Sequence, residues 1–116
     1  MVACFEKCLT ETDIVSRFAL PISWLRVLPP IEQASHEVNF QVTDGFDFFW
    51  EFCCSIRRVG RYRKPVLQSE GWLKFVNYKG LKVGDKIVLD TDDFRGAKFR
   101  IRALKLNKEC DQWLDV

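Results

Sequence analysis

The sequence predicts a mainly β fold that also contains two short helices. Three observations support this prediction: apolar and polar residues alternate with a period of two, turn signals separate the alternating segments, and only brief stretches carry apolar residues at helical spacing. The chain of 116 residues is 47% apolar, which is enough for one domain with one core. About seven short strands must hide their edges, which favours a closed or nearly closed antiparallel barrel.

The first third of the chain predicts two brief helical segments between short strands. Thr10 precedes Asp13 by three residues, the spacing of a capping box, so a single helical turn is expected at residues 14–16. Pro21 is well placed to open a second helical segment, which Pro29 must end. The strands are expected at 3–9 and 18–20, the second helical segment at 22–28, and its buried face at Trp24, Leu25 and Leu28.

The middle of the chain predicts a pair of longer strands. Val38, Phe40 and Val42 alternate with polar residues, as in a half-buried strand, and Asp44-Gly45 is a turn signal. The strands that follow are expected at 46–56, which is rich in aromatic residues, and at 62–67.

The last third predicts one helix and two further strands. Trp72, Phe75 and Val76 stand at i, i+3 and i+4, while Ser69 can cap this helix and Gly80 is placed to stop it. The chain then turns at Gly84-Asp85, and an acidic loop with Asp90, Asp92 and Asp93 separates strands at 87–89 and 99–104. We expect the largest aromatic side chains to lie in the core, namely Trp50, Phe52, Trp72 and Phe75.

Positive charge is concentrated in one part of the chain. The formal net charge is +2, but residues 53–86 carry nine basic residues and two acids, a net +7, which leaves −5 for the rest. This asymmetry is typical of a domain with one side that faces an anion. The densest part, here called the basic segment, has five positive side chains in eight residues: Arg57-Arg58-Val59-Gly60-Arg61-Tyr62-Arg63-Lys64.

The basic segment has three interpretations. It is a solvated loop, a nuclear import signal, or a contact surface for nucleic acid, and the last two are compatible. Four of its five charges are arginine, whose planar fork suits phosphate and the O6/N7 edge of guanine, and Tyr62 places a ring among them that can pack on sugar or base.

Other functional classes lack their characteristic residues. The five cysteines are an odd set without a C-x-x-C pair, so we expect reduced thiols in an intracellular compartment. A single histidine, His36, leaves neither a recognisable zinc ligand set nor a base to activate Cys8 or Cys53 as a nucleophile, so no enzyme, metal or other cofactor is expected. The apolar runs are short and the N-terminus has no basic-then-apolar leader, so a membrane or secreted protein is not expected.

A set of short motifs runs in order along the chain. The motifs are Phe5-x-Lys7-x-Leu9-Thr10-x-Thr12-Asp13-Ile14, Arg17-Phe18-Ala19-Leu20-Pro21, Trp50-x-Phe52 and Gly71-Trp72-x-x-Phe75-Val76-x-x-Lys79-x-Leu81-x-x-Gly84-Asp85-x-Ile87. Together they resemble the plant B3 DNA-binding domain. The ordered match runs from about Phe5 to Leu104, nearly the whole chain. The resemblance implies a seven-stranded, open, antiparallel-rich pseudobarrel with two short helices, as one domain over residues 1–116 with its core at about 5–106.

The resemblance also implies how such a domain binds. B3 domains grip the major groove of duplex DNA between two arms, which correspond here to residues 10–17 and to the basic segment. Some members carry a glycine and a histidine where this chain has Val15-Ser16-Arg17, and the basic segment lacks the Gly-x-Pro arrangement of the auxin response factors. The resemblance therefore predicts the docking mode better than the target sequence.

Candidate DNA contacts follow for both arms and for the helix that contains Trp72 and Phe75. We expect Arg61 and Arg63 to contact base edges, and Arg57, Arg58 and Lys64 to hold phosphates. The first arm offers Ser16 and Arg17, with Lys7 near its base or simply exposed. On the polar side of the helix that contains Trp72 and Phe75, the candidates for contacts with the DNA backbone are Lys74, Asn77 and Lys79. Lys79 can equally pack its aliphatic stem over the core and pair with a carboxylate.

Two functions remain open at this point. The first is a sequence-selective duplex-DNA-binding domain of a plant nuclear transcription regulator, with no small-molecule substrate and no membrane. The second is a degenerate copy of the same fold that serves as a protein-interaction or dimerisation module, in which the arms meet an acidic partner.

Overall fold

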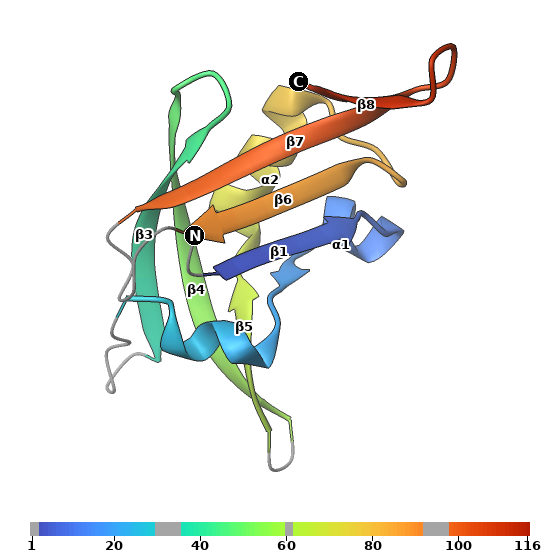
Figure 1. Cartoon of the computed structure of the whole chain (residues 1–116). Helices are drawn as coiled ribbons and strands as arrows, with labels where there is room; N and C mark the ends of the chain where they lie inside the picture. The colour runs from blue at the N-terminus through green and yellow to red at the C-terminus, as the bar shows by residue number, and fades with distance from the viewer. Residues whose placement is uncertain (1–2, 30–35, 60–61, 92–97) are drawn as a thin grey trace.

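One curled sheet forms the body of the molecule, as a computed structural model shows (Figure 1). The structure describes residues 3–29, 36–59, 62–91 and 98–116. The strands are β1 (Ala3–Cys8), β2 (Phe18–Ala19), β3 (Glu37–Asp44), β4 (Phe49–Val59), β5 (Tyr62–Leu67), β6 (Lys86–Thr91), β7 (Phe99–Asn107) and β8 (Gln112–Asp115). The helices are α1 (Glu11–Val15), the 3₁₀ helix η1 (Ile22–Arg26) and α2 (Ser69–Lys79).

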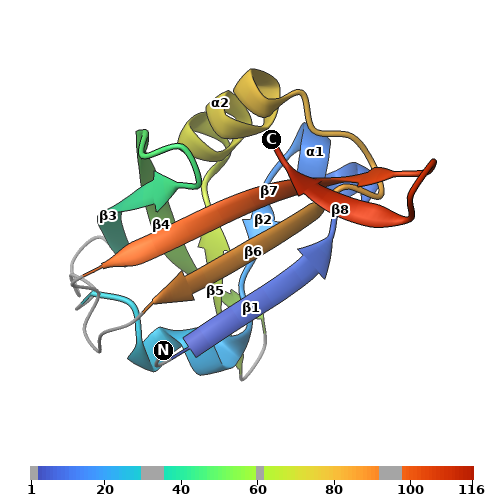
Figure 2. The ribbon, with the colours of Figure 1, turned by 45° about the horizontal axis from the view of Figure 1, so that its top comes forward.

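The strands follow the order β1-β6-β7-β3-β4-β5-β2, and β8 pairs with β7 beside this path. The pairing of β3 with β7 is parallel, and the other pairings between described strands are antiparallel. The sheet curls into a half-barrel, with α2 at one rim and η1 at the other (Figure 2). The predicted seven-stranded, antiparallel-rich open pseudobarrel is thereby confirmed.

The core lies inside the curl and is rich in aromatic side chains. Trp72 is fully buried, with its ring centroid 4.5 Å from that of Phe18 and 6.1 Å from that of Phe52. Phe75 is also fully buried, whereas Trp50 is half-buried because it lies nearer the rim. The predicted core positions on α2 and β4 are therefore correct.

The structure confirms the capping box that the sequence predicts. The amide of Thr10 donates to Asp13 Oδ2 at 2.9 Å, and the amide of Asp13 donates to Thr10 Oγ1 at 3.4 Å. The helix begins at Glu11, earlier than the predicted turn at 14–16, because the box fixes the first turn itself. Gly80 ends α2 with a left-handed φ of 63°, as expected.

Three local predictions were wrong. Leu25 is half-exposed and Val27 is buried instead, because a 3₁₀ helix repeats every three residues and places Val27 on the same face as Trp24. Gln68, not Ser69, is the N-cap of α2, and no side chain caps this helix end. Strand β8 was not predicted, because its residues are largely exposed and show no apolar alternation.

The turn between β3 and β4 also differs from the prediction. The strand predicted at 46–56 begins at Phe49, because the carboxylate of Asp44 accepts hydrogen bonds from the amides of Phe46 and Phe48. Asp47 in this turn has a positive φ of 65°. These bonds hold residues 45–48 as a turn.

Gly71 on α2 packs directly against the backbone of β4, where a Cβ would collide with the carbonyl oxygen of Glu51. Alanine normally stabilises a helix interior by about 1 kcal/mol relative to glycine. At this position we expect Gly71→Ala to destabilise the fold by about 1–3 kcal/mol, because α2 must move away from the sheet. Urea unfolding measures the change, with Gly45→Ala as the control, since a Cβ at Gly45 meets its nearest atom at 4.0 Å. A Gly71→Ala variant as stable as the wild type would contradict this packing.

Candidate nucleic-acid interface

The basic segment lies at the distal end of the β4–β5 hairpin, which extends beyond the rest of the sheet (Figure 1). The sequence predicted a connection after residue 56, but β4 continues to Val59, whereas β5 begins at Tyr62 as predicted. The register places Arg57 opposite Lys64 and Arg58 opposite Arg63. Arg61 lies outside the described residues.

This register pairs cation with cation across the hairpin. Arg57 and Lys64 occupy one pair of opposite positions in the two strands, and Arg58 and Arg63 occupy the next. The register therefore gathers positively charged residues of both strands at one end of the hairpin.

The first arm, residues 10–17, leads into β2 beside the C-terminal end of β5. Ser16 is the C-cap of α1, and the exposed Arg17 directly precedes β2. Because Phe18 of β2 pairs with Leu67 of β5, the first arm is beside the strand that returns from the basic segment. A pocket of about 260 Å³ forms here, lined by Ser16, Arg17, Val66, Gln68 and Ser69.

The first arm is anchored by contacts of Asp13. Its buried carboxylate is 3.0 Å from Lys7 Nζ, which also lies 5.4 Å from the centroid of the Phe18 ring. The backbone carbonyl of Asp13 accepts a hydrogen bond of 2.6 Å from Nε1 of the buried Trp72. Lys7 therefore neutralises a buried acid and positions the first arm. It is not the freely exposed cation that was one of the two expectations from the sequence.

The three candidates on α2 have different environments. Lys74 and Asn77 are exposed, and the ammonium of Lys74 is 3.8 Å from the exposed carboxylate of Glu70, a pair that contributes little at the surface. The side chain of Lys79 is only 5% exposed, and its ammonium is 3.0 Å from Asp44 Oδ2. The structure thus shows the second of the two alternatives for Lys79, and we no longer propose it as a DNA contact.

Sequence reasoning missed the roles of two residues, one in the β3–β4 turn and one beside the first arm. Asp44 was predicted only as part of a turn signal, although it organises the turn with four hydrogen-bonding partners. Gln68 lines the pocket beside Arg17 because β2 pairs with β5, and no local signal in the sequence indicates this pairing.

The thiols of the half-buried Cys53 and the buried Cys54 are not activated. Burial raises the pKa of Cys54 to about 12, and burial together with Glu37 raises the pKa of Cys53. No group of three or more potential metal ligands gathers in the part of the chain that the structure describes. A helix of membrane-spanning length and apolarity is also absent from that part.

Solved structures with the same fold come from Arabidopsis. The chain is similar to FUS3 in a FUS3–DNA complex, with a TM-score of 0.69, 27% sequence identity, and coverage of 87% of this chain and 95% of that one. It is also similar in fold to LEC2 in a LEC2–DNA complex, with a TM-score of 0.66, 20% identity, and coverage of 84% and 88%. A hypothetical Arabidopsis protein matches with a TM-score of 0.59, 17% identity, and coverage of 87% and 88%.

No protein-family model and no curated protein matches the sequence. The similarity to each of these structures extends over more than four fifths of the chain. The two transcription-factor domains among these structures are B3 domains. The chain therefore has a B3-like fold.

Proposed function

We propose that this chain is a sequence-selective duplex-DNA-binding domain of a plant nuclear transcription regulator. The observation that carries the proposal is the basic hairpin, which extends from a fold whose similar structures include two DNA complexes. In this proposal the domain carries out no catalysis. Its affinity comes from neutralising phosphates, and its specificity comes from contacts with base edges.

The two arms have separate roles in this proposal. The hairpin enters the major groove, where Arg61 and Arg63 contact base edges, while Arg57, Arg58 and Lys64 bind phosphates. Tyr62 packs on sugar or base. Two further groups contribute backbone contacts: Ser16 and Arg17 beside their pocket, and the exposed Lys74 and Asn77 on α2.

Salt dependence tests the electrostatic part of this proposal. If about five arm cations displace counterions, the logarithm of the DNA association constant should fall with the logarithm of salt concentration at a slope near −4 to −5. Fluorescence anisotropy with a labelled duplex measures the slope. As a control, Lys108→Ala removes an exposed cation near the β7–β8 turn and should leave the slope unchanged. A flat salt response of the wild type would contradict DNA binding by the basic arms.

A further inference from the structure

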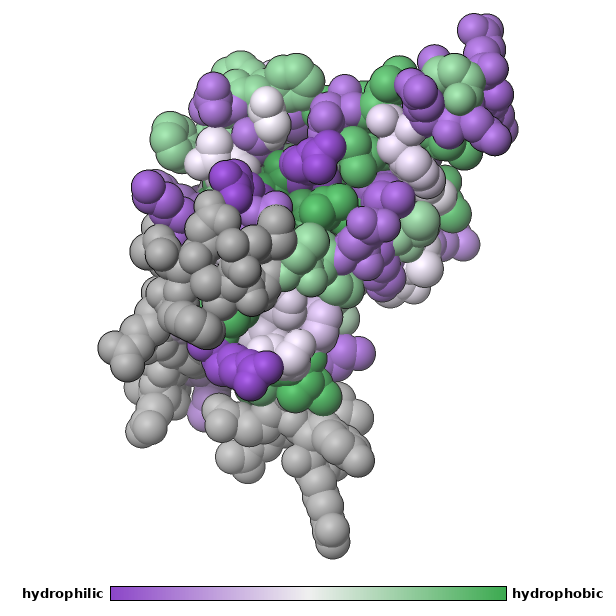
Figure 3. All heavy atoms as spheres, viewed as in Figure 1, coloured by the Kyte–Doolittle hydropathy of each residue, from purple (hydrophilic) through white to green (hydrophobic). Residues whose placement is uncertain are grey.

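An exposed aromatic cluster covers the turn between β3 and β4. Phe46 is 53% exposed, Phe48 54%, Phe49 73% and, on the neighbouring helix α2, Tyr78 63%. The rings of Phe48 and Tyr78 contact each other, with centroids 6.3 Å apart. Figure 3 shows hydrophobic side chains gathered at this end of the molecule. Exposed rings that contact each other, as those of Phe48 and Tyr78 do, are typical of a binding surface, whereas single exposed apolar residues are not.

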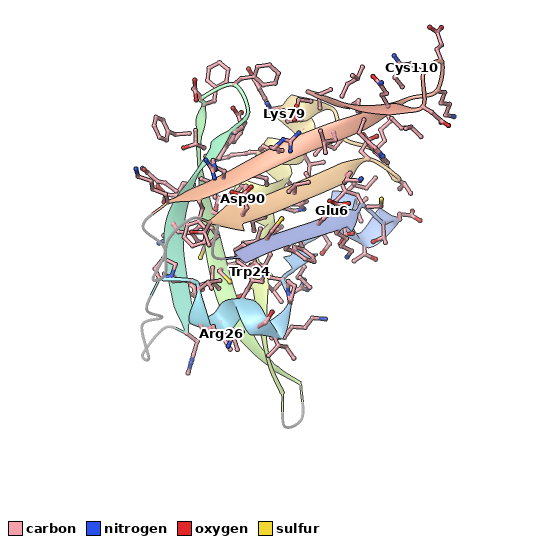
Figure 4. The ribbon with its side chains drawn as sticks, in the orientation of Figure 1. Glu6, Trp24, Arg26, Lys79, Asp90 and Cys110 are labelled. Atoms are coloured by element: carbon pink, nitrogen blue, oxygen red, sulfur yellow. The ribbon has the colours of Figure 1, made fainter. Side chains whose placement is uncertain are left out.

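The turn that presents this cluster is held by a buried ion pair. Asp44 accepts hydrogen bonds from the amides of Phe46 and Phe48 and, at 2.9 Å, from Trp50 Nε1. Lys79, labelled in Figure 4, comes from the C-terminal end of α2, and its ammonium lies 3.0 Å from Asp44 and 4.8 Å from the centroid of the Phe46 ring. The rings are thus displayed on a preorganised turn, which lowers the entropic cost of binding through them.

An acidic groove adjoins the aromatic cluster. It has a volume of about 390 Å³ and runs between β4 and the first turns of α2, with Phe49 and Trp50 in its lining. Glu51 and Glu70 line the same groove and are both exposed, against the single cation Lys74. A third acid, Glu37, accepts a hydrogen bond of 2.7 Å from Gln68 in the lining. The surface therefore combines exposed rings with net negative charge.

Exposed rings beside negative charge favour one kind of binding partner over the others. Glu51 and Glu70 repel phosphate, so the groove favours a cationic partner, with Lys74 as its one positive lining residue. A symmetric contact with a second copy would bring the acids Glu51 and Glu70 of both copies together, which like-charge repulsion disfavours. A partner segment with apolar and basic side chains complements both features.

We propose that the aromatic cluster and the acidic groove together bind a basic, amphipathic peptide segment of a partner protein. An apolar side chain of the segment covers Phe48 and Phe49, and its Lys or Arg residues pair with Glu51 and Glu70. The aromatic cluster lies at the opposite end of β4 from the basic segment. The 11 residues of that strand span about 36 Å at ~3.3 Å per residue, so the aromatic cluster is remote from the basic segment. The groove lies nearer the first arm, because Gln68 lines both the groove and the pocket beside Arg17.

Selection from random 12-residue peptides displayed on phage tests the proposal. The whole chain is immobilised, heparin is present to occupy the basic hairpin, and binders to a Phe48→Ser/Phe49→Ser variant are removed first. We expect the enriched peptides to combine aromatic or aliphatic residues with Lys or Arg. Val83→Ser removes an equally exposed apolar side chain elsewhere and should retain these peptides.

Charge-reversal variants provide a second test of the proposal. A synthetic copy of the most enriched peptide should bind Glu51→Lys/Glu70→Lys roughly tenfold or more weakly than the wild type. The same peptide with Glu in place of each Lys or Arg should show the opposite preference. Selection without enrichment, enriched peptides that are acidic, or an affinity unchanged by charge reversal would overturn the proposal. A concentration-dependent dimer that Phe48→Ser/Phe49→Ser abolishes would also overturn it, because it assigns the surface to a second copy.

Discussion

Replacing Asp44 by alanine is expected to lower the free energy of unfolding by about 3–5 kcal/mol, because it leaves a buried lysine without its counter-charge. The ammonium of Lys79 is 3.0 Å from this carboxylate, and both side chains are almost fully buried. The change also removes the acceptor for the amides of Phe46 and Phe48 and for Trp50 Nε1. Urea unfolding followed by tryptophan fluorescence measures the loss.

Two further variants separate the buried pair from general effects of losing an acid. Asp115→Ala breaks an exposed pair with Arg102 and should cost less than about 1 kcal/mol. Asp44→Asn combined with Lys79→Met removes both charges, so it should destabilise the protein by less than the sum of the single changes. Additive losses would show that Asp44 and Lys79 do not interact.

Asp44 also makes stability depend on pH in a defined direction. Burial alone would raise the pKa of its carboxyl group, but the bonds from Trp50, Phe46, Lys79 and Phe48 outweigh burial and lower the pKa below its ordinary 3.8. The folded state therefore gains stability from Asp44 above the unfolded pKa and loses it as pH falls through the lower folded pKa. The stability difference between the wild type and Asp44→Asn should shrink below about pH 4. A difference that stays constant into this acid range would contradict the role of the charged carboxylate.

Two double variants of the basic segment are expected to weaken DNA binding in different ways. Arg61→Ala/Arg63→Ala removes the proposed base contacts and should reduce discrimination between target and non-target duplexes by about 1–3 kcal/mol per bidentate contact. Arg57→Ala/Lys64→Ala removes two of the three phosphate contacts proposed in the basic segment and should weaken binding to all duplexes about equally. Both variants remove two positive charges, so each should make the salt slope shallower by about 1.8. Affinity titrations with target and scrambled duplexes measure these effects.

The matched charge change makes this comparison decisive. If both variants lose affinity uniformly, the hairpin supplies charge without reading bases. If Arg57→Ala/Lys64→Ala is the variant that loses discrimination, the assignment of roles within the basic segment is reversed.

Local patterns were sufficient to predict much of the fold. The capping box of Thr10 and Asp13, the alternation through Phe40 and Val42, and the stop at Gly80 depend on residues close in sequence, and the structure has each of them. The strand prediction also placed the basic segment at the connection between two strands, and these strands, β4 and β5, pair with each other. These features are predictable because their physical causes act over a few residues.

Features that depend on distant contacts were not predictable in the same way. The role of Lys79 was open until the fold brought it to Asp44, 35 positions earlier in the chain. The aromatic run from Phe46 to Phe49 resembles a strand, but the carboxylate of Asp44 holds most of it as a turn. The pocket beside Arg17 likewise exists because β2 pairs with β5.

Selection of binding sites from random duplex DNA at about 150 mM salt tests the central proposal most directly, because it measures binding and specificity together. The proposed function predicts that the wild type enriches a short motif and that Arg61→Ala/Arg63→Ala, when folded, does not. A folded wild type that enriches no motif would contradict sequence-selective DNA binding. It would instead favour a B3-like domain whose arms bind an acidic protein partner.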